Sequence, residues 1–276
     1  MSRKEIGSLL DLCHRASDSI LQCYYDEARS GLLSSKEDQT PLTKADLASH
    51  EILSEGLHAL RPELPLLSEE CDSSEIADRH HWDTFWMVDP LDGTREFLER
   101  TGEFTINIAL IESQRPTLGL IYEPLFQRAS LGIVGEGAWQ LQLESNDWRA
   151  EQLSVRKLPA DDMVLLASKR HKNPRLESCI AYLSNTHALS RKNSGSALKF
   201  CDLATGRGDC YPRFSLCSEW DVAAGDALVS AAGGAVFGMD GAPLLYNARD
   251  SLLSPNFIAV GDASAPLWDG LLECVR

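Results

Sequence analysis

Basic residues are scarce in this chain relative to acidic ones. The 276 residues include 26 Lys and Arg against 41 Asp and Glu, so the formal net charge at pH 7 is −15. A nucleic-acid-binding surface requires a basic patch or stripe, so this balance argues against a nucleic-acid partner. An anionic small molecule would also be repelled, unless bound cations or a few Lys and Arg residues offset the charge at its binding site.

Long apolar runs and paired cysteines are also absent. No stretch approaches the roughly 18–20 consecutive apolar residues of a membrane-spanning helix, and the N-terminal residues show amphipathic helix spacing without the apolar block of a signal peptide. The eight cysteines include no CxxC pair, which indicates reduced thiols rather than a disulfide framework. We therefore expect a cytoplasmic protein, and its 43% hydrophobic content is enough for a substantial core.

The most informative segment is Trp86–Thr94, which reads WMVDPLDGT. A bulky apolar run ends at Asp89, which predicts a buried strand, and Gly93 opens a predicted helix. Asp89 and Asp92 could hold divalent cations on their oxygens, beside a phosphate bound by helix N–H groups. The alternative interpretation is an acidic turn before a capped helix, because Asp, Gly and Thr are ordinary residues there.

Further acidic residues support the metal site. Glu69 and Glu70 follow the apolar run LPLL. Asp46 lies in the first turn of one predicted helix, and Asp221 lies in the first turn of another. Each alone could be a helix cap or a partner of the helix dipole. Together they form a set of carboxylates without a convergent His or Cys, which favours Mg²⁺ over Zn²⁺.

The order of predicted elements indicates an α/β fold in two halves. Two helices and then a succession of strands favour an antiparallel sheet flanked by those helices, whereas strands and helices alternate as βα units later in the chain. We expect halves at 1–155 and 156–276, with the active site in the cleft between them. Predicted helices cover 4–27, 44–60, 174–183, 196–204 and 221–232, and predicted strands cover 64–68, 85–89, 104–111, 117–123, 129–134, 138–143, 163–167, 186–190, 208–212 and 235–237.

These motifs resemble those of the lithium-sensitive, magnesium-dependent phosphatases, a superfamily of inositol monophosphatases, fructose-1,6-bisphosphatases and bisphosphate nucleotidases. The resemblance implies a layered αβαβα sandwich with a mixed βα C-terminal half. Within the superfamily, the chain is most similar to 3′(2′),5′-bisphosphate nucleotidases of the bacterial CysQ type, nearly throughout its length. The segments that carry the similarity are Asp46, Leu64–Glu70, Asp89–Thr94, Gly102–Glu112, Gly195–Cys201, Tyr211–Phe214 and Trp220–Gly225.

The resemblance implies two or three Mg²⁺ ions and inhibition by Li⁺. A first Mg²⁺ would bind Glu69, Asp89 and the carbonyl oxygen of Leu91. A second would bind Asp89, Asp92 and Asp221. The role of Glu70 is left open.

The resemblance also assigns the catalytic and substrate-binding groups. Asp46 and Thr94, with Glu69, would orient and deprotonate the attacking water, and the N–H groups of Gly93 and Thr94 would hold the phosphate. The other implied substrate contacts are His171, Ser196, Lys199, Arg213 and Asp221. The nearby Lys169 and Arg170 are further candidates for the basic groups of the pocket, and an equally acceptable interpretation is that they are solvated surface residues.

The implied substrate is adenosine 3′,5′-bisphosphate, which would lose its 3′-phosphate to give AMP, with the sulfated analogue as a second substrate. One alternative is an inositol or sugar phosphatase, and another is a nucleotide-binding protein without activity. Cys217 and Glu219, before Asp221, could alter metal affinity or access to the site. The protein is expected to be a monomer or a homodimer, and loose association with the inner membrane is implied only by the resemblance.

Overall fold

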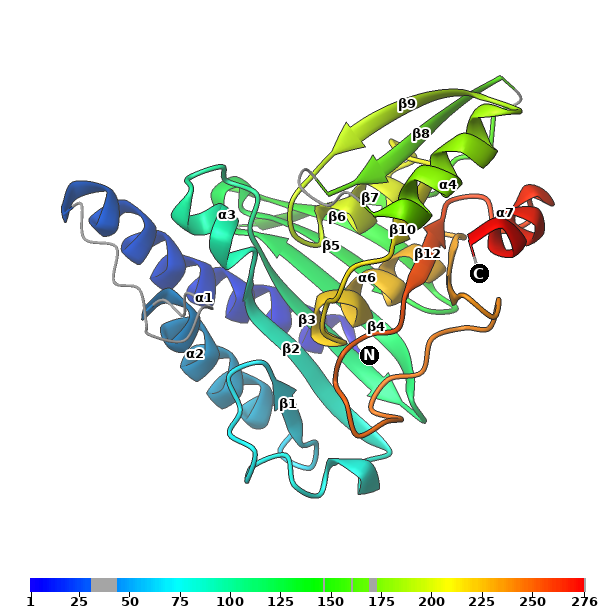
Figure 1. Cartoon of the computed structure of the whole chain (residues 1–276). Helices are drawn as coiled ribbons and strands as arrows, with labels where there is room; N and C mark the ends of the chain where they lie inside the picture. The colour runs from blue at the N-terminus through cyan, green and yellow to red at the C-terminus, as the bar shows by residue number, and fades with distance from the viewer. Residues whose placement is uncertain (31–43, 146, 160, 169–172, 276) are drawn as a thin grey trace.

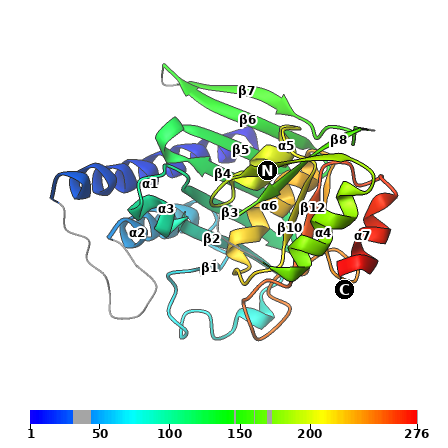
Figure 2. The ribbon, with the colours of Figure 1, turned by 45° about the horizontal axis from the view of Figure 1, so that its top comes forward.

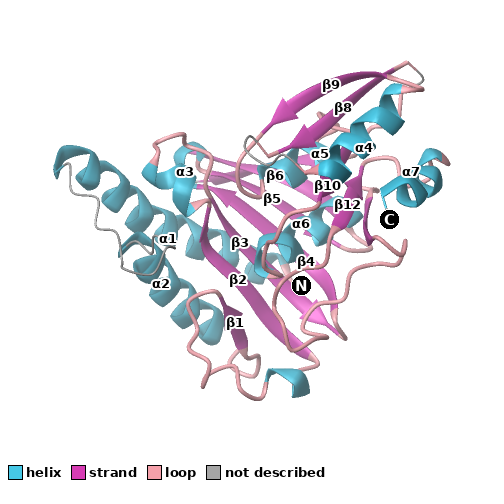
Figure 3. Ribbon diagram, in the orientation of Figure 1, coloured by secondary structure: helices cyan, strands magenta, loops and turns pink. Residues whose placement is uncertain are grey.

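The computed structural model describes residues 1–30, 44–145, 147–159, 161–168 and 173–275 (Figure 1). Its elements form two β-sheets with helices packed on them (Figure 3). Within these described residues, no helix combines the length and the apolar character needed to cross a membrane.

The first sheet has seven strands that follow one another in chain order. They are β1 (Leu66–Ser68), β2 (Thr84–Asp92), β3 (Thr105–Glu112), β4 (Arg115–Glu123), β5 (Arg128–Ile133), β6 (Gly137–Glu144) and β7 (Asp147–Leu153). β1 runs parallel to β2, and the later neighbours in this sheet pair antiparallel. Successive side chains of β2 alternate between two buried faces, with Trp86 packed in one hydrophobic cluster and Met87 in another.

Helices α1 (Arg3–Ser30) and α2 (Lys44–Leu60) cover one face of this sheet (Figure 1). Apolar residues recur at three- and four-residue spacing in both helices, which places Leu9 and Leu53 in one hydrophobic cluster with Trp86. The predicted pair of helices flanking an antiparallel sheet is therefore confirmed.

Helices α5 (Leu198–Ala204) and α6 (Trp220–Ala231) lie on the opposite face of the first sheet (Figure 2). α6 approaches β4 so closely that a Cβ at Gly119 would lie 2.1 Å from the carbonyl oxygen of Ala224. Glycine is therefore required there for α6 to rest on the sheet. This contact fixes the position of α6, whose first turn carries Asp221.

The second sheet packs over α5 and α6 and is mixed. Its strands are β8 (Asp162–Ala167), β9 (Ala188–Asn193), β10 (Cys210–Arg213), β11 (Ala235–Gly238) and β12 (Phe257–Val260), in the order β11-β12-β10-β8-β9. β8 is parallel to β9 and β10, whereas β12 is antiparallel to β10 and β11. Helices α4 (Pro174–Ser184) and α7 (Leu267–Val275) pack on its outer face. The layers thus alternate helix, sheet, helix, sheet, helix, and the predicted αβαβα fold is confirmed.

Two strands, β7 and β12, and one α-helix, α7, were not predicted from the sequence. The remaining elements of the two sheets and their helices match the predicted ranges closely, and the predicted helix after Gly93 is the short α3 (Thr94–Leu98). Two 3₁₀ turns, η1 (Arg79–His81) and η2 (Pro124–Phe126), complete the described elements. The division into halves near residue 155 stays a prediction, and one hydrophobic cluster includes residues of both sheets.

Candidate active site

Three carboxylates from two elements converge at the end of β2. Asp89 and Asp92 lie among the last four residues of this strand, and Asp221 lies in the first turn of α6. One carboxylate oxygen from each lies within 4.8 Å of the other two. A cluster of hard oxygen donors at this spacing suits a hard divalent cation.

An irregularity in β2 allows Asp89 and Asp92 to converge. In a regular strand, residues three apart point to opposite faces. Here the register with β3 shifts between Asp89 and Asp92, where Pro90 has no N–H to donate to the ladder. The N–H of Leu91 instead donates to Oδ1 of Asp89 at 3.0 Å. The DPLD sequence thus turns both carboxylates toward Asp221.

Burial and the repulsion of neighbouring carboxylates raise the pKa values of Asp89 and Asp221. Burial, followed by the charge of Asp92, raises the pKa of Asp221 to about 7, although the N–H of Ser218 donates to its Oδ2 at 2.9 Å. Burial first, and then the charges of Asp92 and Glu69, hold the pKa of Asp89 well above its usual value. A bound cation would relieve this repulsion, so the residues present fit a metal.

Glu69 and Asp46 lie beside this cluster. The N–H of Glu69 donates to the carbonyl oxygen of Val88 at 3.2 Å, which ties the segment after β1 to β2. Much of the Glu69 side chain reaches solvent, but desolvation of its carboxyl, followed by the charges of Asp221 and Asp46, raises its pKa to about 8. Asp46 is itself buried in the first turn of α2. The role of Glu70 stays a prediction.

Gly93 and Thr94 begin the short helix α3. Gly93 has a φ of 89°, and a Cβ there would lie 2.9 Å from the carbonyl oxygen of Glu103, so glycine is required. The Thr94 hydroxyl donates to the carbonyl oxygen of Leu91 at 3.3 Å. Since the first N–H groups of a helix have no intrahelical partner, they can serve a ligand. The expected joint action of Thr94 and Asp46 on the attacking water stays a prediction.

A hydrogen-bonded network on β3 and the loop before α5 positions Asp92. The Ser196 hydroxyl donates to Oδ2 of Asp92 at 2.6 Å, and Nδ2 of Asn107 donates to the same oxygen at 3.3 Å. The Thr105 hydroxyl lies 2.6 Å from that of Ser196 and donates to Oδ1 of Asn107 at 2.9 Å. Thr105 and Asn107 were not predicted as site residues from the sequence. Their two-residue spacing in FTINIALI was the available signal, because it places both on one face of the strand.

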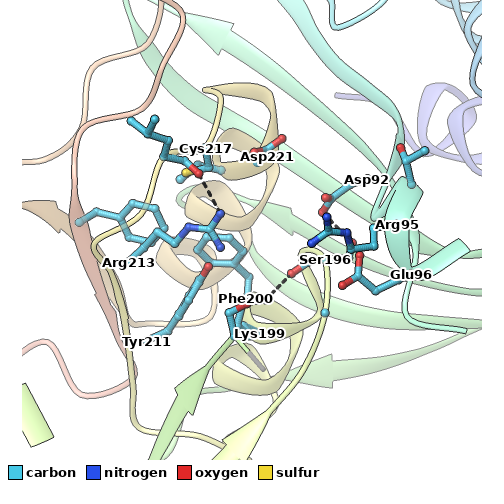
Figure 4. Close-up of a pocket in the computed structure, with 16 residues that line it drawn as sticks. Asp92, Arg95, Glu96, Ser196, Lys199, Phe200, Tyr211, Arg213, Cys217 and Asp221 are labelled. Atoms are coloured by element: carbon cyan, nitrogen blue, oxygen red, sulfur yellow. Dashed lines mark hydrogen bonds between the residues drawn. The ribbon is translucent and has the colours of Figure 1, made fainter. Parts of the chain in front are cut away.

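A cavity of about 500 Å³ opens in front of the acidic cluster. Acidic and basic side chains both line it, with Asp92 and Asp221 on its walls and Lys199 and Arg213 facing them (Figure 4). Ser196 lies between Asp92 and Lys199 in this view, next to Arg95. The arrangement can therefore accept an anionic group that bridges bound cations and basic side chains.

Lys199 is almost completely buried under the cavity. Its ammonium group donates to the carbonyl oxygens of Ser194 and Ser196 at 2.9 and 2.7 Å. Burial lowers its pKa to about 8, and the charge of Asp92 opposes this change. Lys199 thus holds the loop that carries Ser196, in addition to any contact with substrate.

Arg213, the last residue of β10, likewise donates hydrogen bonds to carbonyl oxygens of the loop that follows it. Its Nε donates to the carbonyl oxygen of Ser215 at 3.3 Å, and one terminal nitrogen donates to that of Leu216 at 3.2 Å. The guanidinium is half-buried and extends into the cavity (Figure 4). The structure therefore brings Ser196, Lys199 and Arg213 together beside the acidic cluster.

Residues 9–265 match the Inositol monophosphatase family. The chain belongs to this family. It is 40% identical to the 3′(2′),5′-bisphosphate nucleotidase CysQ of Salmonella typhimurium over 252 residues, which cover 91% of this chain and 98% of that protein. The protein of the same name from Escherichia coli (strain K12) is 38% identical with the same coverage.

Solved structures agree with this family membership. The crystal structure of CysQ from Bacteroides thetaiotaomicron superposes with a TM-score of 0.78 at 35% identity and covers 93% of this chain and 97% of that chain. An IMPase from Thermotoga maritima superposes with a TM-score of 0.73 at 19% identity, covering 99% of this chain and 96% of that one, and is evidence of fold alone. The cluster of Asp89, Asp92 and Asp221 fits the metal dependence of the family.

Glu219 of this family member does not add a carboxylate to the acidic cluster. One of its oxygens accepts from the N–H of Asn247 at 2.6 Å, and the other accepts from the Arg249 guanidinium at 3.0 Å. It therefore anchors the loop after β11 to the start of α6. Cys217 does line the cavity, and burial raises the pKa of its thiol to about 11, so the thiol is neutral at physiological pH.

One predicted substrate contact, His171, lies outside the described residues, as do Lys169 and Arg170. Their assignments stay predictions. The remaining predicted site residues lie on β2, α3, the segment after β1, the first turns of α2 and α6, and the walls of the cavity.

Proposed function

We propose that this protein hydrolyses the 3′-phosphate of adenosine 3′,5′-bisphosphate, releasing AMP and phosphate, with Mg²⁺ as cofactor. 3′-Phosphoadenylyl sulfate is the second proposed substrate, which would give the enzyme a role in sulfur assimilation. The observation that carries the proposal is the pairing, in one cavity, of an acidic cluster with Lys199 and Arg213. Relatives named 3′(2′),5′-bisphosphate nucleotidase, at up to 40% identity over nearly their whole length, support it.

The acidic residues would hold two or three Mg²⁺ ions. Glu69, Asp89 and the carbonyl oxygen of Leu91 are the proposed ligands of one ion, and Asp89, Asp92 and Asp221 those of another. When bound, the ions would supply positive charge to the phosphoryl oxygens and lower the pKa of a bound water. The raised pKa values of Asp89 and Asp221 support this, because burial first and then the charges of neighbouring carboxylates disfavour their ionised forms, which a bound cation would stabilise.

The chain's own residues would orient the reactants. The carboxylate of Asp46 and the hydroxyl of Thr94, together with Glu69, would orient the attacking water and help to deprotonate it. The N–H groups of Gly93 and Thr94 would donate to the phosphate at the start of α3. Ser196, Lys199 and Arg213 would bind the rest of the substrate, including the phosphate that is not cleaved.

The alternative enzyme activity is hydrolysis of inositol or sugar phosphates. Such substrates would use the same acidic cluster and would not require basic groups on the opposite wall. The other alternative, a nucleotide-binding protein without catalytic activity, is disfavoured because every acidic position of the motif set is present. The proposed oligomeric state is a monomer or a homodimer, and the cytoplasmic location stays a prediction.

The test is phosphate release from adenosine 3′,5′-bisphosphate and from inositol 1-phosphate, each with Mg²⁺, with EDTA, and with Mg²⁺ plus Li⁺. We expect Mg²⁺-dependent, Li⁺-sensitive hydrolysis with a strong preference for the nucleotide. A preference for inositol phosphate would retain the metal site and reject the assigned substrate. Asp92→Asn is the control for contaminating phosphatases, since it removes a proposed metal ligand. No release from either compound would reject the enzymatic proposal.

A further inference from the structure

Among the residues that the structure describes, three basic side chains line the cavity, and two of them donate hydrogen bonds to carbonyl oxygens of the protein. The Lys199 ammonium donates to two loop carbonyls, and the Arg213 guanidinium donates to two others. These bonds fix both side chains but use part of their capacity to bind an anion. Lys199 has three N–H donors and Arg213 has five, and each uses two hydrogen bonds on the protein itself, so neither side chain is fully available to a ligand.

Arg95, the third, is differently placed. It lies in the first turn of α3, one residue after Thr94, and its side chain is exposed and lines the same cavity. Among the described residues, no hydrogen bond or ion pair engages its guanidinium. Figure 4 shows it extending toward Ser196 from the side opposite Arg213, with Asp92 and Glu96 next to it. An unengaged guanidinium between acidic neighbours, aimed into a cavity, can bind an anion bidentately.

We propose that Arg95 is a specificity-determining residue that binds the phosphate of the substrate that is not hydrolysed. This inference rests on the proposed function, since it concerns the second phosphate of a nucleoside bisphosphate. The acidic cluster and its cations would take the phosphate to be cleaved. Arg95 and Arg213, on facing walls, then form a clamp for the other.

The placement of Arg95 explains how the site admits a doubly charged anion in a chain of net charge −15. Asp92, Glu96 and Asp221 all line the cavity, so a phosphate distant from the metal ions would meet repulsion. A cation on the α3 wall removes part of that repulsion from the side opposite Arg213. A substrate with one phosphate would gain little from it.

The test compares adenosine 3′,5′-bisphosphate with adenosine 3′-monophosphate, which has the same scissile bond and lacks the second phosphate. Steady-state kinetics would be measured for the wild type, Arg95→Ala and Arg95→Lys. Arg149→Ala is the matched control, since it removes the same charge from an exposed arginine on β7, away from the cavity.

Arg95→Ala is expected to raise KM for the bisphosphate by about 10-fold or more, as for a lost charged hydrogen bond. Its kcat, and both constants for the monophosphate, should stay near the wild-type values. Arg95→Lys should fall in between, because it keeps the charge and loses the bidentate geometry. Arg149→Ala should match the wild type with both substrates.

Two results would overturn the assignment of Arg95. An unchanged KM for the bisphosphate would show that the guanidinium does not bind it. An equal rise for both substrates would place Arg95 on the cleaved phosphate instead. If the wild type releases no phosphate from the bisphosphate, the proposed function fails separately. In that case calorimetric titration is undisturbed by turnover, and it would decide whether Arg95→Ala removes a binding preference for the bisphosphate over the monophosphate. Absence of that preference in the wild type would overturn both the proposed function and the assignment of Arg95.

Discussion

Removing divalent cations should make the stability of the folded protein fall as pH rises. The cause is the acidic cluster, in which the pKa of Asp221 is raised to about 7 and that of Glu69 to about 8, by burial first and then by neighbouring charges. An acid with a raised pKa binds more protons in the folded state than in the unfolded chain. The stabilising effect is complete below the unfolded pKa, near 4, and is lost as pH rises through the folded pKa.

The size of the effect follows from the number of extra protons. Each proton held only by the folded state changes the free energy of unfolding by about 1.4 kcal/mol per pH unit. Asp221 alone would lose roughly 1–1.5 kcal/mol between about pH 6 and pH 8. Glu69 adds less, because solvent screens its exposed side chain. A total of about 1–2 kcal/mol corresponds to a drop in Tm of roughly 2–8 °C for a domain of this size.

The assay is thermal unfolding at several pH values between about 6 and 8, in EDTA and in excess Mg²⁺. Mg²⁺ should increase Tm at every pH, and by more at pH 8, because protons compete with the cation for the carboxylates. Comparing the two series removes the contribution of groups far from the site. Asp92→Asn should flatten the EDTA series, since the charge of Asp92 contributes to the raised pKa values of both Asp221 and Glu69. Parallel series, or a metal-free protein that gains stability with pH relative to the Mg²⁺ form, would refute the reasoning.

Three further predictions concern the site and the packing behind it. Asp92→Asn should reduce phosphate release by more than the about 10–100-fold typical of residues behind a metal ligand, with an unchanged circular dichroism spectrum; normal turnover in saturating Mg²⁺ would contradict the ligand assignment. Li⁺ at roughly tens of millimolar should inhibit turnover, as expected for a weakly held ion on hard oxygen ligands, and insensitivity in a dose series would count against the nucleotidase. Gly119→Ala should cost about 1–3 kcal/mol of stability in denaturant titrations, because its Cβ would meet the α6 backbone. Gly7→Ala, with open space around it, should instead stabilise helix α1 by about 0.5–1 kcal/mol, and equal effects of the two would reject the packing argument.

Much of the fold could be predicted because burial leaves a periodic pattern. The run ending at Val88 and the alternation of FTINIALI indicate strands with buried faces, and α1 shows apolar residues at helical spacing. β7 shows no such pattern, because it is an edge strand whose residues Asp147–Gln152 are mainly exposed. β12 is a run of four apolar residues that pairs with the short strands β10 and β11. Short runs of this kind do not distinguish strand from helix.

The acidic part of the site was more accessible to sequence analysis than its surroundings. Asp89, Asp92 and Asp221 each stand at the end of a strand or the start of a helix, where a carboxylate is chemically distinctive. Polar residues that hold them lack such a signal. Asn107 looks like an ordinary position of an alternating strand, and Glu219 looks like an additional site carboxylate. The contacts of Glu219 are with residues about thirty positions downstream, and spacing alone does not reveal them.

The opposing charges of the site divide the work of binding between metal and protein. A strongly acidic chain gains from carboxylates only where cations neutralise them, so the cluster at Asp89 serves a phosphate through its ions. The second phosphate of the proposed substrate would lie beyond that neutralised region, where it would need basic side chains of the protein itself. Arg213 and Lys199 are held rigid by loop carbonyls, which reduces the entropy lost on binding. The guanidinium of Arg95 is exposed and has no hydrogen bond or ion pair within the described part of the chain, so its donors are all available to a ligand. Selectivity for a bisphosphate should therefore depend more on Arg95, Lys199 and Arg213 than on the metal ligands, which any phosphate ester of the right shape would use.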